Sequence, residues 1–158
     1  MPGHKIHDTV TIVTTAALAV PAWWVNYHML GPVTGAAVTW GVIIGGLSNL
    51  YLTPDLDQAE GWGCYSFHRM RKLNPLLGAI WQGYWYKYGK MCKHRGLSHT
   101  PIVGTLGRVL YGLPWLLPLV LIAFLWWPFA AAWLVGLMWA DLWHTIMDGL
   151  DKALGGRL

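Results

Sequence analysis

Two long stretches without Asp, Glu, Lys or Arg dominate this sequence, one from Thr9 to Pro54 and the other from Val109 to Ala140. A chain of this length has room for one domain, and its apolar content is too high for an ordinary soluble domain of this size. A soluble fold stays open as the less favoured alternative. Hydrophobic residues make up 55% of the chain and charged residues 11%, and twelve Trp and seven Tyr fit aromatic belts at two membrane interfaces. We therefore predict an all-α integral membrane bundle.

Glycines and prolines divide these stretches into four expected transmembrane helices within a single membrane domain, residues 1–158. The spans lie at about residues 9–30, 33–52, 107–127 and 128–150. The first would be about 33 Å long, enough to cross the hydrocarbon core. The second is rich in Gly and Ala, which lets membrane helices approach closely. Pro114 and Pro118 predict an irregular third helix.

The more polar segment 53–101 separates the two helix pairs, and we expect it to carry the function. An apolar and aromatic series recurs there at helical spacing: Leu77, Trp81, Tyr84, Trp85 and Tyr88. The series predicts a short amphipathic helix in the membrane interface, with Lys87 and Lys90 reaching lipid headgroups. A helix packed into a protein core is an alternative that the pattern leaves open.

Charge predicts the orientation. With a cytoplasmic N-terminus, all eleven Lys and Arg residues fall on the cytoplasmic side and none in the two outer turns, so both termini should be cytoplasmic. We see no removable signal peptide before the first helix. Lipid headgroups explain the net charge of +4 better than nucleic acid, which we do not expect as a partner. All seven acidic residues and six of the seven histidines lie on the same side, and only His28 does not.

The fourth span carries Asp141, His144 and Asp148, which lie within about 60° on one helical face. Ionisable groups at that depth usually face a polar interior with partners, although a helix end emerging into water is the simpler alternative. His144 and Asp148 are one turn apart, so both can ligate one ion. Asp55 and Asp57 follow the second span, and in an extended segment both would point the same way, although a solvated acidic turn is possible.

The hexapeptide at residues 94–99 offers His94 and His99 around a glycine, together with Arg95, which suits a phosphate. A basic loop beside the membrane is the alternative. His7 and Asp8 open the first helix, where Asp8 could instead cap it. Because the predicted topology brings these motifs to one surface, we predict a shared metal centre. Its candidate ligands are His7, Asp8, Asp55, Asp57, His94, His99, Asp141, His144 and Asp148.

Imidazole and carboxylate ligands suit Zn best, with Mn or Fe as alternatives, as one ion or two. A bound ion would activate water, and we expect Arg95 to neutralise developing charge and Asp57 to accept a proton. The substrate would be a phosphoester or a lipid headgroup at the cytoplasmic face. Two other hypotheses stay open: a non-catalytic protein whose metal joins the helix ends, with a membrane-protein partner, and a metal transporter.

The motifs GHxxHD, PDLD, HRGLSH and DxxHxxxD occur in this order along the chain. In this order they resemble a family of bacterial metal-binding membrane proteins. They are also similar to the inner-membrane-associated metal-dependent hydrolases described as LexA-binding. The resemblance implies a bacterial inner-membrane location, metal binding and hydrolysis.

Overall fold

The computed structural model describes residues 4–59, 64–92, 96–100 and 102–155. Within these ranges the chain forms seven α-helices and two 3₁₀ helices, with no strand, so the prediction of an all-α fold is confirmed for the described residues. The α-helices are α1 His4–Leu30, α2 Pro32–Ser48, α3 Tyr65–Leu73, α4 Pro75–Met91, α5 Val103–Tyr111, α6 Leu117–Leu125 and α7 Trp127–Ala153. The 3₁₀ helices are η1 Pro54–Gln58 and η2 Leu97–His99.

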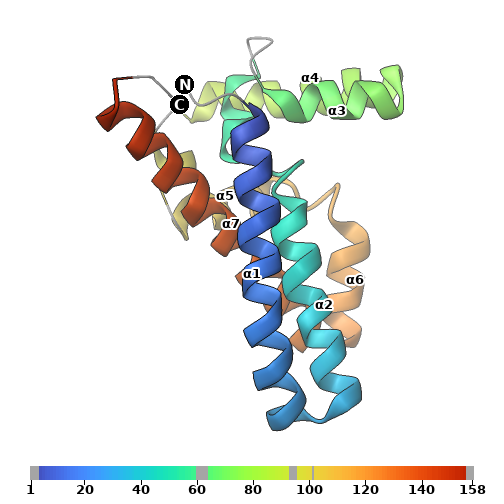
Figure 1. Cartoon of the computed structure of the whole chain (residues 1–158). Helices are drawn as coiled ribbons and strands as arrows, with labels where there is room; N and C mark the ends of the chain where they lie inside the picture. The colour runs from blue at the N-terminus through green and yellow to red at the C-terminus, as the bar shows by residue number, and fades with distance from the viewer. Residues whose placement is uncertain (1–3, 60–63, 93–95, 101, 156–158) are drawn as a thin grey trace.

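Helices α1 and α2 run antiparallel, and α7 packs against both (Figure 1). Gly31 separates α1 from α2 with φ 80°, a conformation that favours glycine, and Pro32 then starts α2. Close packing between α2 and α7 depends on Gly45 and Gly136, because a Cβ at either position would lie within 2.0 Å of a backbone oxygen of the other helix. The sequence prediction that small residues allow close approach is consistent with this geometry.

The third expected span, 107–127, is not one helix. It is divided into α5 and α6 by residues 112–116, and α5 begins earlier than expected, at Val103. Proline cannot donate the backbone hydrogen bond of a helix interior, so Pro114 and Pro118 account for the break. Helix α6 lies along the bundle beside α7, whereas α5 lies closer to the end where α1 begins (Figure 1). The other expected helices differ from the observed ones by a few residues at their ends.

Helices α3 and α4 form a hairpin that runs across the end of the bundle where α1 begins (Figure 1). The helix predicted from the aromatic series is α4, but Trp81, Trp85 and Tyr88 are buried in the hydrophobic core, and Trp85 is 0% exposed. They pack with Leu56 of η1, so this face of α4 forms a core contact. The core alternative is therefore correct for these three side chains. The opposite face remains exposed.

Much of the remaining surface is apolar. No residue of α6 is buried, and Phe124 is 90% exposed. On α1 and α2, Val20 is 71% and Val33 82% exposed. Among the described residues, one helix, Lys5–Leu30, is long and apolar enough to cross a membrane, and α2 is a shorter apolar helix.

Candidate metal centre

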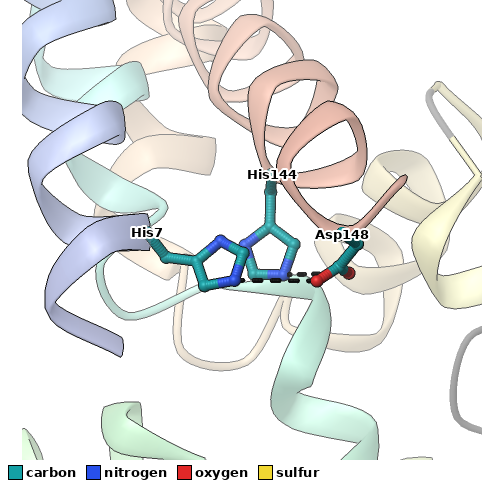
Figure 2. A group of neighbouring side chains, drawn as sticks. All are labelled: His7, His144 and Asp148. Carbon is teal, nitrogen blue, oxygen red and sulfur yellow. Dashed lines mark ion pairs between the residues drawn. The ribbon is translucent and has the colours of Figure 1, made fainter. Parts of the chain in front are cut away.

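The candidate centre begins with His7 near the start of α1 and with His144 and Asp148 near the end of α7. Figure 2 shows the two imidazole rings side by side with the carboxylate beside them. The ring centroids are 4.2 Å apart and the rings are stacked. Asp148 Oδ1 lies 3.6 Å from His7 Nε2, and Asp148 Oδ2 lies 3.7 Å from His144 Nε2. The packing of α1 against α7 therefore joins two motifs from opposite ends of the sequence.

Helix η1 brings Asp55 and Asp57 to the same place. Thr53 caps it, with its Oγ1 accepting a hydrogen bond from the Asp55 backbone N–H, and Pro54 occupies the first turn. The extended conformation expected for this segment is therefore wrong. Asp55 Oδ2 lies 3.7 Å from His144 Nε2, whereas the side chain of Asp57 is fully buried and accepts a hydrogen bond from Ser98 Oγ.

His99, at the end of η2, stands between the carboxylates. Its Nε2 lies 3.5 Å from Asp57 Oδ2 and 3.9 Å from Asp55 Oδ1, and its Nδ1 lies 3.2 Å from Asp148 Oδ2. Thr145 Oγ1 donates a hydrogen bond to the backbone oxygen of His99 and thereby ties η2 to α7. Four separate segments, α1, η1, η2 and α7, thus meet at one cluster of imidazoles and carboxylates.

The spacing of these side chains fits metal coordination. Two atoms that each lie about 2 Å from one tetrahedral ion are about 3.3 Å apart, close to the separations of 3.2 to 3.9 Å in this cluster. Two sets of three residues, His7 with His144 and Asp148, and Asp55 with His99 and His144, have ligand atoms within 4.8 Å of one another. They share His144, whose Nε2 is buried without a hydrogen-bond partner in the described structure. An unsatisfied buried nitrogen is costly unless something binds it, and a metal ion would.

The carboxylates and the imidazoles of the cluster shift each other's pKa values. Burial alone would raise the pKa of Asp55, but the imidazoles of His144, His99 and His7 hold that pKa well below its usual range. Burial alone would lower the pKa of His99, but its interactions with Asp148 and Asp57 raise that pKa to about 9. The carboxylates therefore create a negative potential at the His99 imidazole, which favours a cation.

Asp141 lies outside this cluster, although the sequence placed it among the ligands. One of its carboxylate oxygens accepts hydrogen bonds from Arg108 Nη2 and Thr105 Oγ1, and the other accepts one from Asn49 Nδ2. Arg108 is 1% exposed and Asp141 2% exposed, so this is a buried ion pair. With both oxygens engaged, Asp141 acts as the counter-ion of Arg108.

Arg108 is the important residue that sequence reasoning missed, because it was counted only as a cytoplasmic cation. Its Nη1 donates to the backbone oxygen of Ser98 and its Nε to that of Leu52. It therefore fixes the residues just before η1 and within η2 relative to α7. The available sequence signal was one cation and one carboxylate at the two ends of the same uncharged stretch, residues 109–140.

Of the other site residues predicted from the sequence, one is described by the structure and two are not. Asp8 forms an ion pair with Arg69 of α3 and lies beside the cluster. His94 and Arg95 lie outside the described residues. His28, which the sequence excluded from the site, contacts the rings of Trp24 and Tyr27 in the last turns of α1.

Comparison with known proteins supports a metal. A family model described as uncharacterized metal-binding protein (DUF2227) matches residues 2–156, so the chain belongs to this family. No curated protein and no solved structure matches the chain. The predicted membership of a metal-binding family is thus confirmed, while membrane association and hydrolysis remain predictions.

We predict that His144→Ala or Asp148→Ala lowers metal affinity by at least about tenfold, since even residues that only support a ligand usually contribute that much. His28→Ala is the control and should retain full metal content. Elemental analysis of the purified proteins measures the effect, and far-UV circular dichroism checks that each variant is folded. Undiminished metal in folded His144→Ala would remove this residue from the centre.

We also predict that Arg108→Met destabilises the protein by about 3–5 kcal/mol, because Asp141 would stay buried without its counter-ion. The double variant Arg108→Met, Asp141→Leu leaves no buried charge and should recover much of the loss. Arg71→Met, which removes a partly exposed arginine of α3, should cost less than about 1 kcal/mol. Unfolding in denaturant measures all three, and equal stability of Arg108→Met and the parent protein would contradict the prediction.

Proposed function

We propose that this member of a metal-binding family is a membrane-embedded, metal-dependent hydrolase that acts on a phosphoester or a lipid headgroup. The observation that carries the proposal is that the cluster borders two cavities on different sides. Structural metal ions are usually enclosed by four protein ligands, whereas catalytic ions keep a position open for water or substrate. A cluster open to two cavities favours the catalytic kind.

The first cavity, of about 30 Å³, is lined by His7, Asp55 and His144 together with polar residues that include Ser66 and Arg69. It has room for one water molecule with several polar partners. The second is an open cleft of about 260 Å³ whose lining includes His99 and Asp148. The two cavities thus offer separate places for a water and for a larger group.

The ligand chemistry suits zinc, with manganese or iron as alternatives. His7, His144, His99, Asp55 and Asp148 would hold one or two ions. A bound divalent ion lowers the pKa of its water and polarises a phosphoryl oxygen. Asp57 has no access to either cavity, so we assign it the orientation of His99 and not the acceptance of a proton. Burial raises the pKa of the Cys64 thiol, which makes a competing thiolate ligand unfavourable.

A structural metal is the second candidate. The cluster joins four segments of the chain, so an ion there would also stabilise the fold. The two hypotheses differ in turnover, since only the hydrolase requires an open position at the ion.

Membrane embedding is supported by the exposed apolar surface of α1, α2 and α6 and by the apolar helix Lys5–Leu30. A groove of about 640 Å³ between α1, α2 and α7 has an almost entirely apolar lining that includes Leu18, Val38 and Val135. Contact with lipid chains would remove this surface from water. Helix α1 begins and α7 ends at the end of the bundle that carries the cluster (Figure 1), which we place at the cytoplasmic face of the bacterial inner membrane.

The α3–α4 hairpin would then lie in the headgroup layer. Residues 64–92 contain five Lys or Arg and no acidic residue. The exposed face of α4 carries Leu76 and Ile80 together with Lys87, which lie within about 40° of one another around the helix. These residues replace Trp81 and Trp85 as the proposed membrane contacts, because the two tryptophans are buried.

We predict that the protein loaded with zinc or manganese hydrolyses at least one member of a panel of phosphomonoesters, phosphodiesters and phospholipids. Asp55→Ala and His144→Ala should lose at least about a hundredfold in rate, because the metal-bound water is lost. His28→Ala should keep the parent rate. Release of phosphate or alcohol is measured before and after chelation. Tight metal binding without turnover on any member of the panel would favour the structural alternative.

We predict that spin labels on Phe124→Cys and Leu76→Cys, in a Cys92→Ser background, are accessible to oxygen and protected from a water-soluble nickel reagent. The buried Cys64 should not be labelled. The measurement is made with the protein in lipid nanodiscs. The label at position 124 tests whether the helix bundle contacts lipid, and the label at position 76 tests the same for the α3–α4 hairpin. A label at Phe124 that is freely accessible to the nickel reagent would contradict membrane embedding.

A further inference from the structure

We propose that the open cleft between η2 and the end of α7 receives a phosphate-bearing anion, and that Lys152 binds the phosphate. This inference rests on the proposed function, because it concerns access to the same metal centre. The cleft has a volume of about 260 Å³, and its lining includes His99 and Thr100 on one side and Thr145, Asp148, Gly149 and Lys152 of α7 on the other. The two cluster residues in this lining connect the cleft directly to the candidate ions.

Helix α7 supplies one continuous wall. Thr145 lies three and four residues before Asp148 and Gly149, and Lys152 lies four and three residues after them, so all four share one side of the helix. Lys152 lies one turn beyond Asp148 and is exposed, and it makes no ion pair with a described acidic side chain. Its ammonium group is therefore available at the outer edge of the cleft.

The net charge of the metal-loaded cluster favours an anionic ligand in the cleft. Asp55, Asp57 and Asp148 together carry three negative charges, so the cluster alone would repel an anion. Two divalent ions would turn this into one net positive charge, and Lys152 adds a second. A phosphate dianion would balance both charges, since its oxygens bind divalent ions and ammonium groups alike.

The volumes of the two cavities indicate which of them admits the substrate. The cavity beside His7 and Asp55, at about 30 Å³, is too small for a phosphate ester, whereas the cleft is only slightly smaller than common small-molecule sites. The substrate would therefore enter past Lys152 while the smaller cavity holds water. The phosphate could belong to a soluble ester or to a lipid headgroup, and the chemistry of recognition is the same.

Gly149 provides a specific way to close the cleft. A Cβ at this position would meet no atom within 4 Å, so a larger side chain can be added without disturbing the packing of α7. Because Gly149 lines the cleft, Gly149→Leu would fill it from the α7 wall.

The test measures binding of inorganic phosphate to the metal-loaded full chain by calorimetry, with metal content determined for each protein. Lys152→Gln should weaken phosphate binding roughly fivefold, the effect of losing one partly screened charge pair. Gly149→Leu should abolish measurable binding. Lys72→Gln, which removes an exposed lysine from the end of α3, should bind phosphate as the parent does. All variants should retain their metal.

Competition then identifies the source of the phosphate. Displacement by glycerol phosphate alone indicates a soluble ester, and displacement by phosphatidic acid in nanodiscs alone indicates a lipid headgroup. Displacement by neither overturns the proposal, as does parent-like phosphate binding by Lys152→Gln and Gly149→Leu with full metal content. In those cases the metal centre itself stands. A parent protein that takes up no metal would overturn the proposed function as well.

Discussion

The buried ion pair between Arg108 and Asp141 is the interaction on which the geometry of the candidate centre depends. Burying two charges is expensive, and the cost is offset only when the geometry is good and the remaining donors and acceptors are satisfied. Here one guanidinium reaches Asp141 together with the backbone oxygens of Leu52 and Ser98. Asn49 and Thr105 donate the remaining hydrogen bonds to the Asp141 carboxylate. The pair thus positions α7, η1 and η2, the three segments that carry all cluster residues except His7.

The candidate metal cluster, unlike the Arg108–Asp141 pair, is not held together mainly by short hydrogen bonds among its described side chains. The ion pair is self-sufficient, whereas the cluster gathers three carboxylates and several imidazole nitrogens at separations of 3.2 to 3.9 Å that are mostly longer than good hydrogen bonds. Such longer contacts leave carboxylate and imidazole atoms that a cation could bind. Because the ion pair and the cluster are separate networks, the ion pair would hold the surrounding segments in place while the cluster takes part in the proposed exchange of metal, water and substrate.

The sequence predicted the cluster well because its prediction needed only topology. Helices that return to one surface bring their ends together, so the motifs around His7, Asp55, His99 and His144 had to converge. It did not identify the partner of Asp141, because helical spacing defines a face but not a partner. Asp141 and His144 are three residues apart, and the difference in role comes from Arg108 on another helix. The break between α5 and α6 was indicated by prolines, but the position of α5 depends on contacts that are distant in sequence.

The order of side chains along α7 connects these observations. From Trp133 to Ala140 the helix packs apolar and small residues, and Asp141 follows as a paired ion. His144 and Asp148 join the cluster one and two turns later, and Lys152, a further turn along the helix, is exposed. In the proposed membrane, the free-energy cost of a charged group rises with its depth, and the order along α7 matches this cost. A carboxylate deep in the bundle needs a permanent counter-ion. A carboxylate nearer the surface can accept an exchangeable ion, and a lysine at the surface needs only water or a passing anion. The proposed chemistry of the centre therefore depends on its position at the end of the bundle, where the described charged groups are both held by protein and close to the surface.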